Sequence, residues 1–171
     1  MMKFYSNSLL ATTPNIGLII TDFLQLTKFR LAISVVFSSL AGYLLAVDKI
    51  ETQILFGLSL GGFAMVGASN AFNQLIEKNK DSLMVRTQNR PLPGGRMSIN
   101  IAATIAIFLA FTGIVILHYI NYKTAIFGVL SIFLYTCVYT PLKSVTSLSV
   151  FVGAFPGAIP FMLGWVAATG S

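Results

Sequence analysis

Three side chains that can bind a metal ion, Asn73, Glu77 and Asp81, follow one another at intervals of four residues. If this stretch is helical, each interval turns the chain by about 400°, so the three lie along one face and drift by only about 40° per step. Oxygen ligands stacked about 6 Å apart suit a hard cation such as Mg²⁺, which commonly binds through one or two carboxylates together with substrate phosphates. The spacing therefore predicts a face that holds a metal ion, which in turn holds a phosphate.

Arginines follow the acidic residues directly. Arg86, Arg90 and Arg96 lie in a segment whose prolines and glycines, at 91–95, must break out of helix. A guanidinium group matches phosphate oxygens in a bidentate geometry, and Arg86 and Arg90 stand four residues apart. Metal-binding acids followed by phosphate-binding arginines favour a diphosphate site at the membrane surface, with a lipid tail lying among the apolar segments.

The same stretch has an alternative interpretation as a solvated cytoplasmic loop. Its arginines would then only set the topology and contact anionic lipid, and charge alone favours that interpretation. The spacing of the acids favours the diphosphate site instead. So does Asn73, which lies inside an otherwise apolar run, because polar groups within a membrane are costly and by default functional.

The elements that must position these residues are membrane-spanning helices. The sequence is 56% hydrophobic and 9% charged, whereas soluble chains carry about 25% charged residues. A spanning helix needs about 20 apolar residues. Five uncharged runs are candidates: 31–47, 52–76, 97–122, 124–142 and 144–171. We therefore expect an all-α fold, a polytopic membrane bundle of about five transmembrane helices.

The basic residues predict the orientation of this bundle. If the loops alternate between two sides, Lys49 and Lys123 fall on one side and every other lysine and arginine falls on the other. The positive-inside rule then places the N-terminus and an active-site loop at 77–97 in the cytoplasm. Because the basic residues flank spans and form no exposed patch, orientation explains the net charge of +6 better than a nucleic acid does, and we expect no nucleic-acid partner.

Residues 1–27 are predicted to form an N-terminal tail and an interfacial helix, and residues 28–171 the transmembrane domain. Apolar residues recur at roughly helical intervals before the first span and are interrupted by Asp22, which is typical of a helix at the membrane surface. In the last span, Pro156 and Pro160 free backbone carbonyl groups, which a membrane tolerates only against protein or a water-filled cavity. A cavity beside this span is therefore expected.

The segment NQLIEKNKDSLMVRTQNRPLPGGR, residues 73–96, resembles the first acidic motif of the UbiA-type intramembrane prenyltransferase family, in which N(x)3D(x)3D precedes R-T-x-x-R-P-L. Residues 26–46 and 139–165 resemble the branch of this family that farnesylates protohaem IX. The resemblance implies a cell inner-membrane enzyme whose partners are farnesyl diphosphate, haem b and the lipid bilayer. It implies that farnesyl diphosphate ionises at a Mg²⁺ site, and that a haem vinyl group captures the allylic cation while water completes the hydroxyl group of haem O.

The resemblance also gives roles to individual residues. It implies that Glu77 and Asp81, with Asn73 assisting, are the catalytic residues and hold Mg²⁺. It implies that Arg86 and Arg90 bind the diphosphate. These roles are consistent with the chemistry of the residues, because Mg²⁺ and the two arginines would neutralise the charge of the departing diphosphate.

Two residues at the end of the fourth run match the family as well. The resemblance makes Tyr139 and Lys143 substrate-binding residues, with Lys143 a further phosphate contact. Each has an equally good alternative explanation, an aromatic belt for the tyrosine and the positive-inside rule for the lysine. Relatives often carry aspartate at the position of Glu77 and a third acid at that of Asn79, so the metal site here has less charge than the usual pattern.

The length of the chain departs from the family pattern, which has about nine spans and a second acidic motif in its C-terminal half. We therefore expect the N-terminal portion of such an enzyme, either truncated or completed by the missing C-terminal half or another polypeptide. Two other functions stay open on the sequence. One is prenyl transfer to an aromatic quinone precursor, and the other is a catalytically incomplete membrane fragment that binds prenyl diphosphate or a partner.

Overall fold

The computed structural model describes residues 16–170, and within that range it contains helices and turns but no strand. The helices, in chain order, are α1 (Ile16–Leu26), α2 (Phe29–Ala46), α3 (Thr52–Asp81), α4 (Ile99–Ile120), α5 (Tyr122–Phe133), the π-helical η1 (Leu134–Tyr139), α6 (Thr140–Leu142) and α7 (Ser149–Thr169). Because α5, η1 and α6 follow one another directly, they form one long helix. Of the predicted N-terminal segment 1–27, residues 1–15 lie outside the described range.

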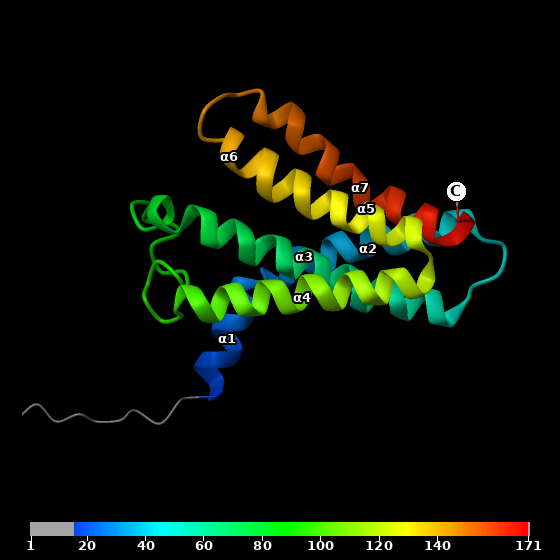
Figure 1. The fold of residues 1–171 in the computed structure, drawn as a ribbon, viewed down its shortest axis with the longest axis horizontal. Helices are drawn as coiled ribbons and strands as arrows, with labels where there is room; N and C mark the ends of the chain where they lie inside the picture. Colours follow the sequence, from blue (N-terminus) through cyan, green and yellow to red (C-terminus); the bar gives the residue numbers. More distant parts are fainter. Residues whose placement is uncertain (1–15, 171) are drawn as a thin grey trace, which may run out of the picture.

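Among residues 16–170, five helices are long and apolar enough to cross a membrane: Phe29–Ala46, Thr52–Asp81, Ile99–Ile120, Tyr122–Leu142 and Ser149–Thr169. They run up and down the long axis of the molecule, so that chain neighbours are antiparallel (Figure 1). The prediction of an all-α bundle with five transmembrane helices is therefore confirmed. The uncharged stretches of the sequence predicted the spans correctly because burying an ionised side chain in a membrane costs free energy.

The helix α3 positions the predicted metal ligands. It contains 30 residues, so it is about 45 Å long and extends past a hydrocarbon layer of about 30 Å. It ends at Asp81, and residues 82–98 form a series of turns that includes the left-handed Gly95 (φ 70°). The first residues of the predicted active-site loop, 77–81, are thus helical, and the turns begin after them.

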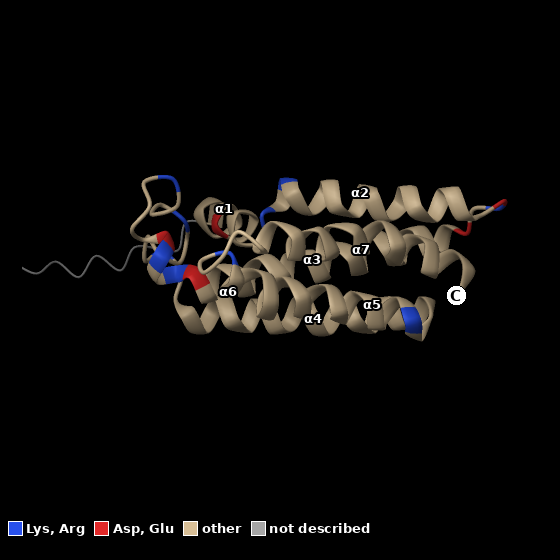
Figure 2. Ribbon diagram, turned by 90° about the horizontal axis from the view of Figure 1, so that it is seen from above, with Lys and Arg blue, Asp and Glu red and all other residues tan. Residues whose placement is uncertain are grey.

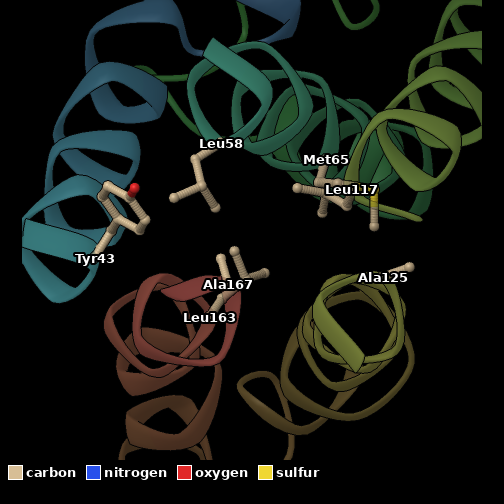
Figure 3. Packing of buried hydrophobic residues seen from close by; sticks show 7 residues of the cluster. All are labelled: Tyr43, Leu58, Met65, Leu117, Ala125, Leu163 and Ala167. Carbon is tan, nitrogen blue, oxygen red and sulfur yellow. The ribbon is translucent and has the colours of Figure 1, made fainter. Parts of the chain in front are cut away.

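The bundle is held by close packing of the spans. The helix α2 packs along α7, α3 packs along α4, and α5 contacts both α4 and α7. Glycine permits the contact of α2 with α7, because a Cβ atom at Gly164 would collide with the backbone of Ser39, and one at Gly42 with the backbone of Phe161. Lipid tails are as apolar as the side chains, so such packing matters more here than transfer out of water. The core cluster in Figure 3 draws on all five spans: Tyr43, Leu58, Met65, Leu117, Ala125, Leu163 and Ala167.

A sharp break separates α1 from α2. Lys28 adopts the left-handed conformation there (φ 49°, ψ 56°), which is uncommon for a residue other than glycine and often marks a functional site. Side chains of α3 satisfy the carbonyl groups at the end of α1. Gln74 Nε2 donates to the carbonyl oxygens of residues 25–26 at 3.0 Å each, and Asn70 Nδ2 donates to Thr27 O at 3.1 Å. The helix α3 thereby holds the break in place.

Charged residues are concentrated at the two ends of the bundle (Figure 2). Among the described residues, every lysine and arginine except Lys49 and Lys123 lies at the end that holds the 82–98 turns, which we call the site end. The helix α1 lies at the site end too, at an angle to the bundle (Figure 1). Its exposed apolar side chains suit the interfacial position that the sequence predicts: Ile16, Leu18, Ile19 and Ile20.

Candidate active site

The acidic face of α3 is buried at the site end. Asn73, Glu77 and Asp81 are 1%, 7% and 4% exposed, respectively. The helix continues through Asp81, as alignment of the three on one face requires. Carboxylates are rarely buried to this extent unless they are paired or bind a metal, so their partners define what the site can do.

Two basic side chains neutralise these carboxylates. Lys143 Nζ donates to Glu77 Oε2 at 2.7 Å, and Arg90 Nη1 donates to Asp81 Oδ2 at 2.6 Å. Thr87 fixes the turn that carries Arg90, since its Oγ1 donates to Asp81 O at 2.9 Å. Lys143 follows α6, whereas Arg90 lies in the turns after α3. Two separate segments therefore bring positive charge to the same face.

Both the nitrogen and the oxygen of the Asn73 carboxamide form hydrogen bonds. Its Nδ2 donates to Glu77 Oε2 at 3.0 Å and to Thr140 Oγ1 at 3.1 Å. Its Oδ1 accepts from Lys28 Nζ at 3.5 Å. Thr140 Oγ1 in turn donates to Tyr135 O at 2.7 Å. In the structure, Asn73 thus orients a neighbouring carboxylate and a lysine, and it links the acidic face to η1.

The sequence argument overlooked Lys28 as a site residue. Burial, and to a smaller extent the nearby positive charges of Arg90 and Lys143, lower the pKa of Lys28 to about 8, although the carboxylates of Glu77 and Asp81 act in the opposite direction. Three cations thus face two carboxylates, an arrangement that an added anion would stabilise. One feature of the sequence does indicate this lysine. It lies at the junction of the predicted interfacial helix and the first span, on the side of the membrane where the acidic residues are also predicted.

The other two arginines of the predicted loop lie away from the acids. Arg86 is exposed and makes no hydrogen bond or ion pair with any described residue. Arg96 donates from Nε to Asp22 Oδ1 at 2.9 Å and from Nη2 to Gln25 Oε1 at 3.1 Å. Arg96 therefore links the 82–98 turns to α1. Of the three arginines, Arg90 alone reaches the acidic face.

A largely apolar cavity of about 520 Å³ lies among α2, α3, α5, η1 and α7. Its volume is in the usual range of small-molecule pockets, about 300 to 1,000 Å³. Tyr135 and Tyr139 line it, with their ring centroids 5.4 Å apart. Gly153 makes room for the second ring, because a Cβ atom there would come within 2.8 Å of Tyr139. Pro156 and Pro160 also line the cavity, so the prediction of a cavity beside the last span is confirmed.

The donor set on α3 fits Mg²⁺ in company with an anion better than Mg²⁺ alone. Within residues 16–170, no three or more His, Cys, Asp or Glu side chains form a group that could hold a metal ion. Glu77 and Asp81 offer two carboxylates, and each is already paired with a cation. Mg²⁺ prefers six oxygen ligands and often takes several from water and substrate phosphates. A diphosphate would supply such oxygens and would give Lys28, Arg90 and Lys143 new partners.

Comparison with known sequences points to one family. Residues 35–171 match the UbiA prenyltransferase family. The protoheme IX farnesyltransferase of Flavobacterium psychrophilum is 66% identical over 165 residues, which make up 95% of this chain and 55% of the relative. The mitochondrial protoheme IX farnesyltransferase of Homo sapiens is 41% identical over 148 residues, which make up 86% of this chain and 33% of the relative. The chain thus spans about half, or less, of the length of these curated relatives.

Two solved structures share the fold. One, from work on digeranylgeranylglyceryl phosphate synthase in membranes, has a TM-score of 0.81 at 20% identity, and the match covers 88% of this chain and 53% of that chain. The other is a UbiA homologue from Archaeoglobus fulgidus bound to DMAPP and Mg²⁺, with a TM-score of 0.74 at 18% identity, and the match covers 88% of this chain and 55% of that chain. At these identities the likeness concerns the fold alone.

Proposed function

The chain belongs to the UbiA prenyltransferase family, and on that premise we propose that it serves to transfer a farnesyl group from farnesyl diphosphate to a vinyl group of haem b (protohaem IX), giving haem O. The relatives named protoheme IX farnesyltransferase support this choice of donor and acceptor. One observation carries the proposal: three cations converge on two buried carboxylates beside a largely apolar cavity.

The cations bind the diphosphate. Lys28, Arg90 and Lys143 surround the acidic face, and in a site of low dielectric their charge stabilises the negative charge that develops on a leaving group. Arg86 is exposed and has no partner among the described residues, so it is free to add a bidentate contact to the same diphosphate. The binding of farnesyl diphosphate thus uses basic residues from three segments of the chain.

The carboxylates hold the metal. Glu77 and Asp81 would bind Mg²⁺, with Asn73 assisting and orienting Glu77. When bound, Mg²⁺ would neutralise part of the diphosphate charge and so promote its departure. A UbiA homologue bound to DMAPP and Mg²⁺ supports the choice of metal.

The cavity receives the farnesyl chain. Its largely apolar lining excludes water from the allylic carbon, which would otherwise be hydrolysed. In the transfer, the bond from the allylic carbon to oxygen breaks and its electron pair leaves with the diphosphate. A vinyl carbon of haem b then bonds to the allylic carbon, and the oxygen of a water molecule bonds to the neighbouring vinyl carbon with loss of a proton. Tyr139 borders the reacting carbon. It lines the cavity, and the centroid of its ring is 5.6 Å from Lys143 Nζ.

The bundle lies in the cell inner membrane as a multi-pass protein, with its N-terminus and site end in the cytoplasm. The excess of lysine and arginine at the site end supports this orientation. A diphosphate head then enters from water, while its prenyl tail stays among the spans.

The test is haem analysis in a bacterial host that lacks haem O synthase. Because the curated relatives are longer than the matched region, the complete reading frame that contains residues 1–171 is expressed. We expect mass spectrometry of extracted pigments to detect haem O, and a Lys123→Met variant, altered at the opposite end, to produce as much. Membrane-inserted protein that leaves only haem b would contradict the proposal, and a prenylated quinone precursor in its place would identify an aromatic acceptor.

A further inference from the structure

The apolar cavity among α2, α3, α5, η1 and α7 becomes more enclosed with distance from the site end. Its lining at the site end includes exposed residues, with Leu31 49% and Val150 79% exposed. Farther from the site end the lining is buried, with Met65 4% and Leu163 6% exposed. Met65 and Leu163 also belong to the core cluster of Figure 3. These two residues therefore form a floor, where the cavity meets the packed core of the bundle.

One side of this floor is closed by the contact of α2 with α7. Gly164 follows Leu163 directly, and a Cβ atom at Gly164 would collide with the backbone of Ser39. Ser39 is also the last residue of α2 that lines the cavity. Because the two backbones touch at this level, an alkyl chain that enters from the site end cannot continue between them. This part of the floor is fixed by the fold.

The other side of the floor is the side chain of Met65. It fills the space that two glycines leave free, because a Cβ atom at Gly113 would lie 2.7 Å from Met65 Sδ and one at Gly128 would lie 3.0 Å from Met65 Cε. Gly128 lines the cavity as well. Methionine is flexible and fills irregular gaps in a core. Met65 is therefore the part of the floor that a substitution can remove without changing the contact of α2 with α7.

The depth of the cavity matches three isoprene units. Gly62 is the deepest residue of α3 that lines the cavity, and it lies about 16 Å along the helix axis from Asn73, where the acidic face begins. With C–C bonds of about 1.5 Å, an extended farnesyl chain is about 14 Å long, whereas chains of two and four units are about 9 and 19 Å long. A farnesyl chain thus reaches the floor without folding, and a chain of four units is too long.

We propose that Met65 limits the prenyl donor to three isoprene units, which makes it a specificity-determining residue for the transfer. This inference rests on the proposed function and adds the residue that selects the length of the chain. The last isoprene unit of a farnesyl chain contacts Met65 and Leu163. A shorter chain leaves space above the floor and loses these dispersion contacts. A longer chain must fold or displace the floor, which is costly in a packed core.

The test compares donor analogues of three lengths with the complete protein and Mg²⁺. Geranyl, farnesyl and geranylgeranyl thiolodiphosphates are cleaved very slowly, so calorimetry can measure the Kd of each. We expect the wild type to bind the farnesyl analogue about 10-fold more tightly than either of the others. Met65→Ala removes Cγ, Sδ and Cε from the floor, and the Kd of the geranylgeranyl analogue should then come within about threefold of that of the farnesyl analogue.

Leu58→Ala is the matched control for Met65→Ala. Leu58 is a fully buried member of the same core cluster, but it does not line the cavity. Its truncation weakens the core as well, yet it should leave the order of the three affinities unchanged. With geranylgeranyl diphosphate and haem b, mass spectrometry should detect a haem that carries four isoprene units in Met65→Ala and much less of it in Leu58→Ala.

A second variant shortens the cavity and does not require a cavity in the core. Val66 lines the cavity about 10 Å along the axis of α3 from Asn73, so a larger side chain there leaves room for two isoprene units. Val66→Phe should therefore bind the geranyl analogue about 10-fold more tightly than the farnesyl analogue.

The same selectivity in Met65→Ala and the wild type, or an equal change in Leu58→Ala, would overturn the role of Met65. A wild type that binds the three analogues equally, or a Val66→Phe variant that still prefers the farnesyl analogue, would show that the depth of this cavity does not select the chain. In each case a wild type that forms haem O leaves the proposed function intact. A wild type that binds none of the analogues would overturn the proposed function, and this inference with it.

Discussion

Lys143 and Glu77 stand 66 residues apart in the chain, yet their side chains meet at 2.7 Å. Asp81 is likewise paired, with Arg90 at 2.6 Å. Each cation contacts one oxygen of its carboxylate and thereby competes with a metal ion for the negative charge of that group. Bound diphosphate offers the cations new partners, so the proposed function favours an exchange in which the acids take Mg²⁺ and the basic residues take phosphate. Binding of one ligand then favours the other, and this coupling is reciprocal.

The exchange predicts opposite effects of Lys143→Met on the two ligands. Without the ammonium group Glu77 is free, so Mg²⁺ alone should bind about 10-fold more tightly. Farnesyl thiolodiphosphate loses a charged hydrogen bond and should bind about 10- to 100-fold more weakly. Calorimetric titration of each ligand measures both changes, and Lys123→Met, at the opposite end of the bundle, is the control. Weaker binding of both ligands would show that no exchange takes place.

Lys28 predicts a pH dependence of diphosphate binding. Its pKa of about 8 in the ligand-free protein rises when an anion binds, because the anion favours the ammonium form. Affinity is thus greatest below pH 8 and falls as the pH rises above it, by at most about 10-fold per unit. The Kd of farnesyl thiolodiphosphate between pH 6.5 and 9.5 should show this decline, and Lys28→Met should bind more weakly and lack it. An identical decline in the variant would assign the titration to another group.

The contact of Arg96 with Asp22 predicts a structural role for an arginine that the sequence groups with the phosphate ligands. Single variants Arg96→Gln and Asp22→Asn and the double variant form a cycle, for which we expect a coupling energy of about 1 kcal/mol in thermal unfolding. Diphosphate affinity should change by less than about threefold in these variants, in contrast to Arg90→Gln. A large loss of affinity in Arg96→Gln with unchanged stability would instead place Arg96 among the phosphate ligands.

The close approach of α2 and α7 predicts a difference between two glycines of α7. A Cβ atom at Gly164 would meet the backbone of Ser39, whereas one at Gly157 would meet nothing within 4 Å. Gly164→Ala should lower the free energy of unfolding by about 1 to 3 kcal/mol or more, and Gly157→Ala should have little effect. Unfolding in detergent measures both, and equal midpoints would refute the tight α2–α7 contact.

The spans and the spacing of the acids could be predicted from the sequence because both depend on local properties. A run without charge marks a helix in the membrane, and a four-residue interval sets a face in any helix. The long α3 then carries Asn73, Glu77 and Asp81 into the site without help from distant residues. The cavity beside α7 followed in the same way, from Pro156 and Pro160.

The partners of the acids could not be predicted because they come from distant segments. Lys143 reaches the site only because α3 and η1 lie side by side, and Lys28 only because side chains of α3 hold the break after α1. Arg96 looks like a phosphate ligand in the sequence, yet Asp22, 74 residues away, is its partner. Charge and spacing alone do not distinguish a ligand from a residue that links two elements.

The central claim, that this face of α3 binds a metal and a prenyl diphosphate together, is tested most directly by Asp81→Asn. This change keeps the size of the side chain and removes its charge. The measurement is the Kd of farnesyl thiolodiphosphate with and without Mg²⁺, in the wild type and in the variant. We expect Mg²⁺ to lower the Kd of farnesyl thiolodiphosphate by about 100-fold in the wild type. In the variant, which has lost a carboxylate ligand, Mg²⁺ should lower this Kd by less than about 10-fold. Equal Mg²⁺ effects in the two proteins, or none in the wild type, would contradict the account.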